Sequence, residues 1–474
     1  MTRALLAAAA AGFGIVSCSA NSANPPVSSS AARIAQSATQ LRHKTSQPIQ
    51  HVIVLIQENR SFDDFFADYP GADGATQGKM KGPHGDKTIK LHEANLVEPC
   101  DFGHSYNGFL KDYDGGKMDG FNGESVGAQC TGLSQRRPYQ YVNPTQIAPY
   151  WDIAEQYVLA DHMFQTQGSG SYTAHQDLIR GGTTIDQNQV ESIVDDPSSS
   201  PWGCDAQVGT TVPLLEWQGG KLHRATGPYP CTNAFPSSGS YYATMRDLLD
   251  AKSVSWKYYS PPVKNGVGKY WNAFDTIASV RFGPEWGTNV TTSEPFEKGI
   301  FNDISAGTLP AVSWVIPDDG NSDHPGVASD RGPGWIASVV NAIGESSYWD
   351  STAVIVVWDD WGGFYDHEPP PLTDHWGGLG FRVPMLLVSA YAKLGTESRG
   401  GYISHTQYEF GSILHFIEDT FSLGSLGTTD QRAASIADSL DFSQPPRSFT
   451  AIPSSYSRAY FLHQRESYRP IDTQ

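Results

Sequence analysis

The sequence predicts an α/β fold, a three-layer αβα sandwich in which helices cover both faces of a mostly parallel central sheet. Short runs of β-branched and aromatic residues alternate with helical patterns from residue 51 onwards. The runs are apolar at successive positions, which is typical of strands covered on both faces. Strands that alternate with helices indicate a parallel sheet. The expected strands are Val52–Ile56, Tyr157–Leu159, Val254–Tyr258, Ala311–Ile316, Ala353–Trp358 and Val383–Val388.

Helices are expected at Tyr242–Lys252, Gly334–Gly344 and Gln407–Phe421. In the second of these, apolar residues recur at the spacing of one helix face. Residues 67–145 and 185–240 are long, rich in Gly and Pro, and contain cysteines. Because structureless loops of this length are uncommon in compact domains, we expect ordered insertions that form a cap over the edge of the sheet.

Composition excludes several classes of protein. The chain has 474 residues, with 39% hydrophobic and 17% charged residues, which is not the composition of a disordered or coiled-coil protein. The formal net charge of −18 repels polyanions, so we expect no nucleic-acid partner.

The N-terminus has the pattern of an export signal. Arg3 provides a positive charge, and the apolar stretch Ala4–Val16 is too short to span a bilayer. We therefore expect a signal peptide at 1–23, a polar tether at 24–47 and one catalytic domain at 48–474. Cys18 either becomes the lipidated first residue of a lipoprotein or is removed with an ordinary signal. In both cases the protein is exported to the periplasm or the exterior, and any membrane contact is through the N-terminal lipid.

Four cysteines remain after Cys18. An even number in an exported chain predicts two disulfides, and three connectivities are possible. Proximity in sequence favours Cys100–Cys130 and Cys204–Cys231. None of them stands in a C-x-x-C pattern, which argues against a zinc knuckle.

Polar side chains follow four of the expected strands, at the edge where open α/β sheets bind ligands. Converging carboxylates repel one another and usually need a cation between them. Several such groups at one edge are more specific than a lone aspartate, which is usually a solvated loop residue. The groups are Glu58 and Asn59, then Asp161 and His162, then Asp318, Asp319, Asp323 and His324, then Asp359 and Asp360 with Asp366 and His367.

A second element is the stretch QTQGSGSYTAHQDLIRGGT, residues 165–183. Small residues surround Ser171, and a helix can begin just after it. A serine on such a turn has an exposed hydroxyl and nearby backbone N–H donors, as a nucleophile requires. A plain flexible turn is the alternative. The order of residues is not that of the G-x-S-x-G nucleophile elbow, so α/β-hydrolase chemistry is not supported.

Five segments, in order, resemble the bacterial phosphoesterase family, which holds the non-haemolytic phospholipases C and the acid phosphatase A-like enzymes of the alkaline phosphatase superfamily. The resemblance runs from about residue 50 to about residue 420 and implies an alkaline phosphatase-like fold. The matching segments are ENRSFD from Glu58, His104 with the later MDGF stretch, GSYTAHQ from Gly170, SDHP from Ser322, and VVWDDWGGFYDHEPPP, which ends at Pro371.

The resemblance implies roles for the site residues. Ser171 is then the nucleophile and forms a phosphoserine. A divalent cation, such as Zn, Ca or Mg, lowers the pKa of its hydroxyl. The ligands of this cation are expected to be Glu58, Asn59, Asp359 and Asp360, whose oxygens suit a hard ion.

The histidines have the remaining tasks. His104 and His324 bind the phosphate oxygens and protonate the leaving alkoxide, and we assign the protonation to His324. Asp323 or Asp366 orients a histidine or belongs to a second metal site. His162, His175 and His367 are weaker candidates, of which His367 is closest in sequence to the acidic pair. Arg60 is expected to form a salt bridge with Asp63 or Asp64 in preference to binding phosphate.

The sequence indicates the type of reaction more closely than it indicates the substrate. Ser171 stands where the phospholipases commonly have Thr, and Asp360 where many have Glu. Ser171 with His175-Gln176 favours an acid phosphatase acting on phosphomonoesters, and a phospholipase C acting on phospholipid is the alternative. A sulfatase is disfavoured because neither a cysteine nor Ser171 has Pro at +2 and Arg at +4. A surface lipoprotein that binds phosphorylated ligands without turnover is the candidate from another class.

Overall fold

The computed structural model describes residues 48–465 apart from residues 128, 129, 131, 133, 187, 189, 233–241, 293–296, 372–377 and 396–400. The expected signal peptide, the lipidation at Cys18 and the polar tether lie outside the described residues. No helix among the described residues is long and apolar enough to cross a membrane.

The centre of the fold is an eight-stranded sheet with the order β12-β11-β13-β1-β14-β15-β6-β16. Neighbouring strands are parallel except around β15, which runs antiparallel to both β14 and β6. The sheet is therefore mostly parallel, as predicted. Its strands are β1 (His51–Gln57), β6 (Val158–Ala160), β11 (Trp256–Tyr259), β12 (Val290–Thr291), β13 (Val312–Val315), β14 (Thr352–Trp358), β15 (Met385–Ser389) and β16 (Tyr402–Ser404).

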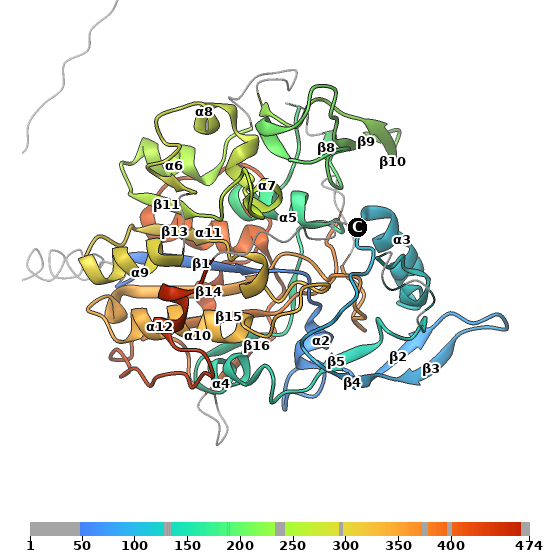
Figure 1. Ribbon diagram of the computed structural model, residues 1–474, viewed down its shortest axis with the longest axis horizontal. Helices are drawn as coiled ribbons and strands as arrows, with labels where there is room; N and C mark the ends of the chain where they lie inside the picture. Colours follow the sequence, from blue (N-terminus) through green and yellow to red (C-terminus); the bar gives the residue numbers. More distant parts are fainter. Residues whose placement is uncertain are drawn as a thin grey trace, which may run out of the picture. The chain divides into compact units, whose positions relative to one another are not determined.

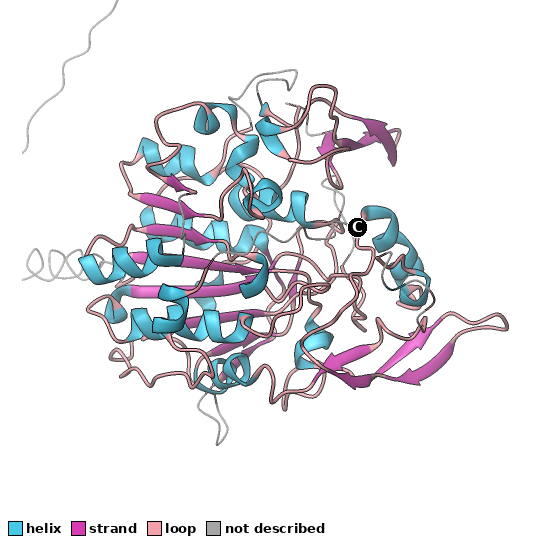
Figure 2. Ribbon diagram, in the orientation of Figure 1, coloured by secondary structure: helices cyan, strands magenta, loops and turns pink. Residues whose placement is uncertain are grey.

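Helices cover both faces of this sheet (Figures 1 and 2). On one face α10 (Gly332–Gly344) packs against α4 (Ala148–Gln156), α9 (Glu297–Ala306) and α12 (Arg458–His463). On the other face α5 (Ser171–Arg180) packs against α6 (Met245–Ala251), α7 (Gly268–Trp271) and α11 (Phe410–Phe421). The three expected helices correspond to α6, α10 and α11. The remaining short helices are α2 (Phe62–Phe66), α3 (Tyr106–Tyr113) and α8 (Ala278–Arg281).

The register of the central strands determines where the polar strand ends meet. All residues of β14 are buried, and those of β1 are buried from Val52 onwards, as their continuous apolar runs require. Gln57, the last residue of β1, pairs with Trp358, the last residue of β14. Glu58 and Asp359 therefore leave the sheet side by side.

The two insertions contain secondary structure of their own. The first carries the hairpin β2 (Gln77–Met80) and β3 (Lys87–Lys90), the parallel pair β4 (His92–Ala94) and β5 (Gln140–Val142), and α3. The second carries β8 (Glu191–Ile193), β9 (Pro213–Gln218) and β10 (Lys221–Thr226). Both lie beyond the C-terminal end of β1 in Figure 1. A further short pair, β7 (Met163–Phe164) and β17 (Tyr408–Glu409), lies outside the main sheet.

Disulfides close both insertions in the pairing that sequence proximity favoured. Cys100 is bonded to Cys130, and Cys204 to Cys231. Such bonds restrict the unfolded chain and are typical of proteins that fold in an oxidising compartment.

Arg60 stabilises the corner where β1 ends. Its side chain is 1% exposed and pairs with Asp64 at 2.9 Å, which is one of the two salt bridges expected from the sequence. It also donates to the carbonyl oxygens of Asp323, at 2.9 and 3.0 Å, and of Leu96, at 2.9 Å. Arg60 thus joins the first strand end to two distant loops.

We expect Arg60→Ala to lower the free energy of unfolding by about 3–5 kcal/mol, because Asp64 would remain buried without its partner. Chemical denaturation measures this. Arg458→Ala is the matched control, since its ion pair with Glu345 is exposed and worth less than about 1 kcal/mol. Equal effects of the two substitutions would show that Arg60 does not support the corner.

Candidate active site

Residues from three segments meet at the C-terminal ends of β1 and β14. The segments are the loop after β1, the loop after β14, and α5. The backbone N–H of Asn59 donates to Asp359 Oδ1 at 2.8 Å, and the N–H of Asp360 donates to the same oxygen at 2.8 Å. Glu58, Asn59, Asp359 and Asp360 are each 0% exposed. The four residues predicted as cation ligands are therefore all at one buried corner.

The backbone at this corner is unusually close-packed. Asn59 has φ of 58°, in the left-handed region that asparagine tolerates better than most residues. Gly362 also has a left-handed φ, and a Cβ on it would lie 2.2 Å from the carbonyl oxygen of Asn59. Only glycine fits at 362, and this lets the loop after β14 fold back onto the loop after β1.

The donor set of this corner fits a divalent cation. Ligand atoms of Glu58, His175 and Asp359, named here the Glu58 cluster, lie within 4.8 Å of one another. His175 Nε2 is 3.0 Å from Glu58 Oε1 and 3.7 Å from Asp359 Oδ2. These values bracket the ligand-to-ligand distance of about 3.3 Å expected around a tetrahedral ion with bonds of about 2.0–2.1 Å.

Buried oxygens at the corner lack hydrogen-bond donors. Glu58 Oε2, Asn59 Oδ1 and Asp359 Oδ2 have no hydrogen-bond partner among the described residues. A buried polar atom without a partner is costly, so three at one place indicate a missing positive group. Burial, and then the charge of Asp359, raise the pKa of Glu58 well above its ordinary value. A cation among these oxygens would remove that penalty.

Ser171 lies at the first position of α5, after Gly170 at the N-cap. Its hydroxyl donates to Asp360 Oδ2 at 3.0 Å, and the other oxygen of Asp360 accepts from the N–H of Gly362 at 2.7 Å. The start of a helix provides N–H groups and a positive dipole end, which favour negative charge at this point. Asp360 thus faces the serine hydroxyl, while Asp359 faces His175.

The two expected active histidines are both buried. His104 Nδ1 lies 2.7 Å from the carbonyl oxygen of Phe102, and its Nε2 lies 3.0 Å from Asn59 Nδ2 and 3.9 Å from Asp360 Oδ2. The ring of His324 stacks on Trp271 with centroids 5.7 Å apart. Burial lowers the pKa of His324 to about 4. For His104 burial acts in the same direction, but Asp101, the Phe102 carbonyl, Asp196 and Asp359 together outweigh it and raise the pKa.

The other predicted residues have different surroundings. Asp323 accepts from the hydroxyl of Tyr150, and its backbone carbonyl accepts from Arg60. Asp366 pairs with Arg382 at 2.9 Å. His367 pairs with Asp63 and His162 with Asp161, each at 2.8 Å. Asp366 and His367 are thus grouped with Asp63, and His162 with Asp161 and His405, away from the Glu58 cluster.

Two residues of the corner were not identified as strong candidates from the sequence. His367 ranked above His175 because it is nearer to Asp359 along the chain, and the structure reverses that order. Asp196, in the second insertion, accepts from the N–H of Tyr172 at 3.4 Å, at the start of α5. Burial raises its pKa to about 7, against the opposing charge of His104. His175 reaches the corner because α5 packs there, whereas no local sequence pattern identifies Asp196 as a site residue.

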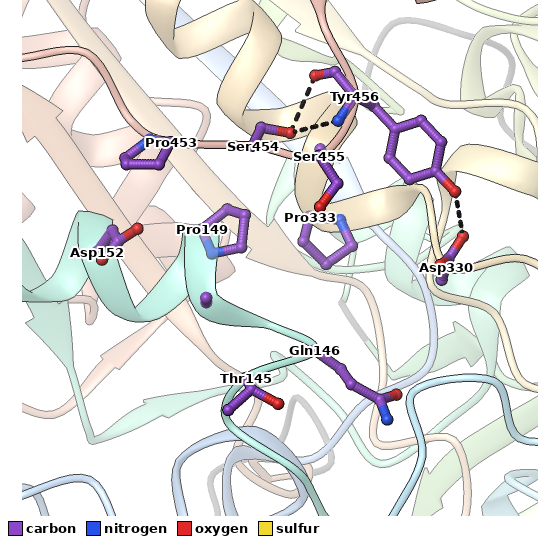
Figure 3. Close-up of a pocket in the computed structure, with 12 residues that line it drawn as sticks. Thr145, Gln146, Pro149, Asp152, Asp330, Pro333, Pro453, Ser454, Ser455 and Tyr456 are labelled. Atoms are coloured by element: carbon purple, nitrogen blue, oxygen red, sulfur yellow. Dashed lines mark hydrogen bonds between the residues drawn. The ribbon is translucent and has the colours of Figure 1, made fainter.

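A pocket of about 490 Å³ lies elsewhere, between the N-terminal ends of α4 and α10 and residues 453–456 (Figure 3). Its lining includes Asp152, Asp330 and Tyr456, and the Tyr456 hydroxyl donates to Asp330 at 2.6 Å. None of the predicted site residues lines it.

This fold, with a serine at a helix start beside buried carboxylates, is an arrangement suited to hydrolysis of phosphoric esters. A model of the phosphoesterase family matches residues 49–424, and the chain belongs to that family. This confirms the family resemblance seen in the sequence motifs.

Relatives with curated names match along most of the chain. Non-hemolytic phospholipase C of Burkholderia pseudomallei is 24% identical over 91% of this chain and 64% of its own length. Phospholipase C B of Mycobacterium tuberculosis is 26% identical over 84% of this chain and 78% of its own length. A solved structure of an alkaline phosphatase superfamily protein from Vibrio parahaemolyticus is 11% identical, covering 82% of this chain and 72% of that one, with a TM-score of 0.34.

We expect Asp359→Asn to release the bound cation while keeping the backbone, because an amide oxygen still accepts from the N–H groups of Asn59 and Asp360. Elemental analysis after dialysis would show loss of metal. The metal-free variant should be more stable than the metal-free wild type by about 1–3 kcal/mol, because one buried like charge is removed. Exposed Asp350→Asn is the matched control. Unchanged metal content in Asp359→Asn would exclude a cation at this corner.

Proposed function

We propose that the protein is a metal-dependent phosphoric ester hydrolase that acts through a phosphoserine on Ser171. The single observation that supports this most is the 3.0 Å contact between Ser171 Oγ and Asp360 Oδ2 beside the Glu58 cluster. It puts a nucleophile at the same corner as a cation site. Family membership supports the same chemistry.

Each residue has a definite task in this proposal. Glu58, Asn59 and Asp359 would hold a divalent cation, with His175 as a further ligand. When bound, the cation supplies a positive charge that favours the alkoxide form of Ser171. Asp360 orients the Ser171 hydroxyl and accepts its hydrogen bond. Ser171 then attacks phosphorus, and the ester oxygen leaves.

The two histidines complete the chemistry. We keep the assignment of leaving-group protonation to His324, and give His104 the binding of the phosphate oxygens. Because burial lowers the pKa of His324 to about 4, the protonation step requires acidic solution, in which His324 carries the proton. The position of His104 supports its part, because its Nε2 lies 3.9 Å from the same Asp360 oxygen that accepts from the Ser171 hydroxyl. Stacking on Trp271 supports the part of His324, because it limits rotation of the imidazole ring. Water then hydrolyses the phosphoserine.

For the substrate we propose a phosphomonoester. Ser171 is only 4% exposed, and a small phosphoryl group with one ester arm fits such a nucleophile best.

The second candidate is a phospholipid or another choline-type phosphodiester. The Asp196 carboxylate beside the start of α5 favours it, because a negative group there attracts a cationic head group. The names of the relatives point the same way.

We also propose that the protein works outside the cytoplasm, in the periplasm or beyond the cell. The two disulfides support this, because such bonds persist where conditions are oxidising.

Ser171→Ala should reduce hydrolysis of p-nitrophenyl phosphate by about 10³-fold or more, because the covalent step is lost. Metal content and thermal unfolding should stay as in the wild type. Ser169→Ala, two residues earlier in the same turn, is the matched control and should keep most of the activity. Wild-type turnover by Ser171→Ala would remove it as the nucleophile. Acid quench followed by mass spectrometry should find phosphate on the peptide with Ser171.

The substrate class can be decided by comparing p-nitrophenyl phosphate with p-nitrophenyl phosphorylcholine, each with and without chelator. We expect release mainly from the monoester, and loss of that activity with chelator. Release only from the choline ester would support phospholipase C. A protein that binds both but releases neither would be the phospho-ligand-binding alternative.

A further inference from the structure

Two histidines from separate loops lie on either side of one carboxylate of the first insertion. His162 follows β6 and His367 follows β14, while Asp73 lies in the loop after α2. His162 Nε2 is 3.3 Å from Asp73 Oδ2, and His367 Nε2 is 3.5 Å from Asp73 Oδ1. The two rings therefore face different oxygens of the same side chain, and Asp73 lies between them.

A second carboxylate faces the other nitrogen of each ring. His162 Nδ1 is 2.8 Å from Asp161 Oδ1, and His367 Nδ1 is 2.8 Å from Asp63 Oδ2. A neutral imidazole has one N–H and one lone pair, so in that form a lone pair would point at a carboxylate oxygen. Only the protonated ring donates from both nitrogens. The geometry therefore favours a positive charge on His162 and on His367.

The pKa values of the two histidines agree with this geometry. The hydrogen bond to Asp161 raises the pKa of His162 above its ordinary value. For His367 burial acts in the opposite direction, but the contact with Asp63 and the charge of Asp366 outweigh it and raise the pKa to about 9. Both rings thus keep their protons to a higher pH than an ordinary histidine.

The elements packed against the two rings carry further charges. Arg382 is 0% exposed, lies 3.9 Å from Asp73 Oδ2 and acts against protonation of both rings. The charged groups that face the rings and Asp73 are Asp63, Asp161, Asp366, Glu368, Arg382 and His405. Among these described residues the carboxylates outnumber the one arginine, so protonated histidines help to balance the charge.

The loop that carries Asp73 is attached to the same carboxylates as the rings. The N–H of Asp73 donates to Asp161 Oδ2 at 2.9 Å, and the N–H of Ala75 donates to Asp63 Oδ1 at 3.1 Å. Arg382 donates to the carbonyl oxygen of Asp73 at 2.8 Å. Asp63 and Asp161 are both 0% exposed. The attachment of the loop is therefore coupled to the charge of the two rings.

We propose that Asp73, His162 and His367 form a pH-sensitive clamp, which holds the start of the first insertion against the sheet while both rings are protonated and releases it when they lose their protons. The proton leaves from Nε2, because the carboxylate at Nδ1 keeps the other proton in place. Each Nε2 lone pair then faces an oxygen of Asp73 and repels it. The clamp attaches the insertion that also carries His104, and it does not rest on the proposed hydrolysis.

The clamp should open as the pH rises. Because the pKa of His367 is raised from 6.5 to about 9, its contribution to the closed clamp is fully present below about pH 6.5. This contribution is lost as the pH rises through about 9. We therefore expect a closed clamp in acidic and neutral solution and its release in alkaline solution.

Hydrogen exchange of the intact protein, followed by mass spectrometry, measures this release. After correction for the intrinsic exchange rate, the protection of peptides covering residues 67–76 should fall about tenfold or more between about pH 6.5 and about pH 9.5, since each unit of raised pKa is worth a factor of ten. Peptides from α10 should keep their protection. His415→Gln is the matched control and should behave as the wild type, because His415 lies on α11 and pairs with Asp419.

Two variants remove the clamp in different ways. The double variant His162→Gln/His367→Gln cannot gain the two charges, so residues 67–76 should have low protection already at about pH 6.5, with no further fall at higher pH. Asp73→Asn removes the shared carboxylate and should give the same result, which keeps the test decisive if the double variant does not fold. Protection in the wild type that does not change with pH, or a wild-type pH dependence in a folded variant, would overturn the clamp.

Discussion

The active corner depends on one electrostatic constraint, the burial of several carboxylates close together, away from bulk solvent. Glu58, Asp359 and Asp360 are fully buried at two adjacent strand ends. Burial, and then the charge of Asp359, raise the pKa of Glu58 and of Asp360 well above the ordinary value. In such an arrangement the carboxylates keep their negative charge only beside a compensating positive group, and otherwise take up a proton. The oxygens without donors show where that charge belongs.

The rest of the fold holds this corner in place. The parallel register of β1 with β14 puts the two acidic strand ends side by side, and Gly362 lets their loops touch. Arg60 then fastens the corner to the loops that carry Asp323 and Leu96. The nucleophile Ser171 belongs to a different element and lies at the start of α5. The large apolar sheet around the site provides stability that offsets the backbone strain and the buried charge of the site.

Much of this arrangement is predictable from the sequence, because apolar runs mark the strands and polar residues mark their ends. The strand ends carrying Glu58 and Asp359 could therefore be assigned in advance to the same edge of the sheet. The direction of β15 could not, since an apolar run has the same composition in either orientation. His175 and Asp196 depend on how α5 and the second insertion pack, which no local pattern encodes.

The central claim is that a cation and Ser171 act on the same phosphoryl group. The most direct measurement is a crystal structure of the protein with a divalent metal and orthovanadate, in which anomalous scattering locates the metal. We expect vanadium bonded to Ser171 Oγ, with the metal between the oxygens of Glu58, Asn59 and Asp359. Vanadate bound away from Ser171, or a metal absent from that corner, would contradict the account.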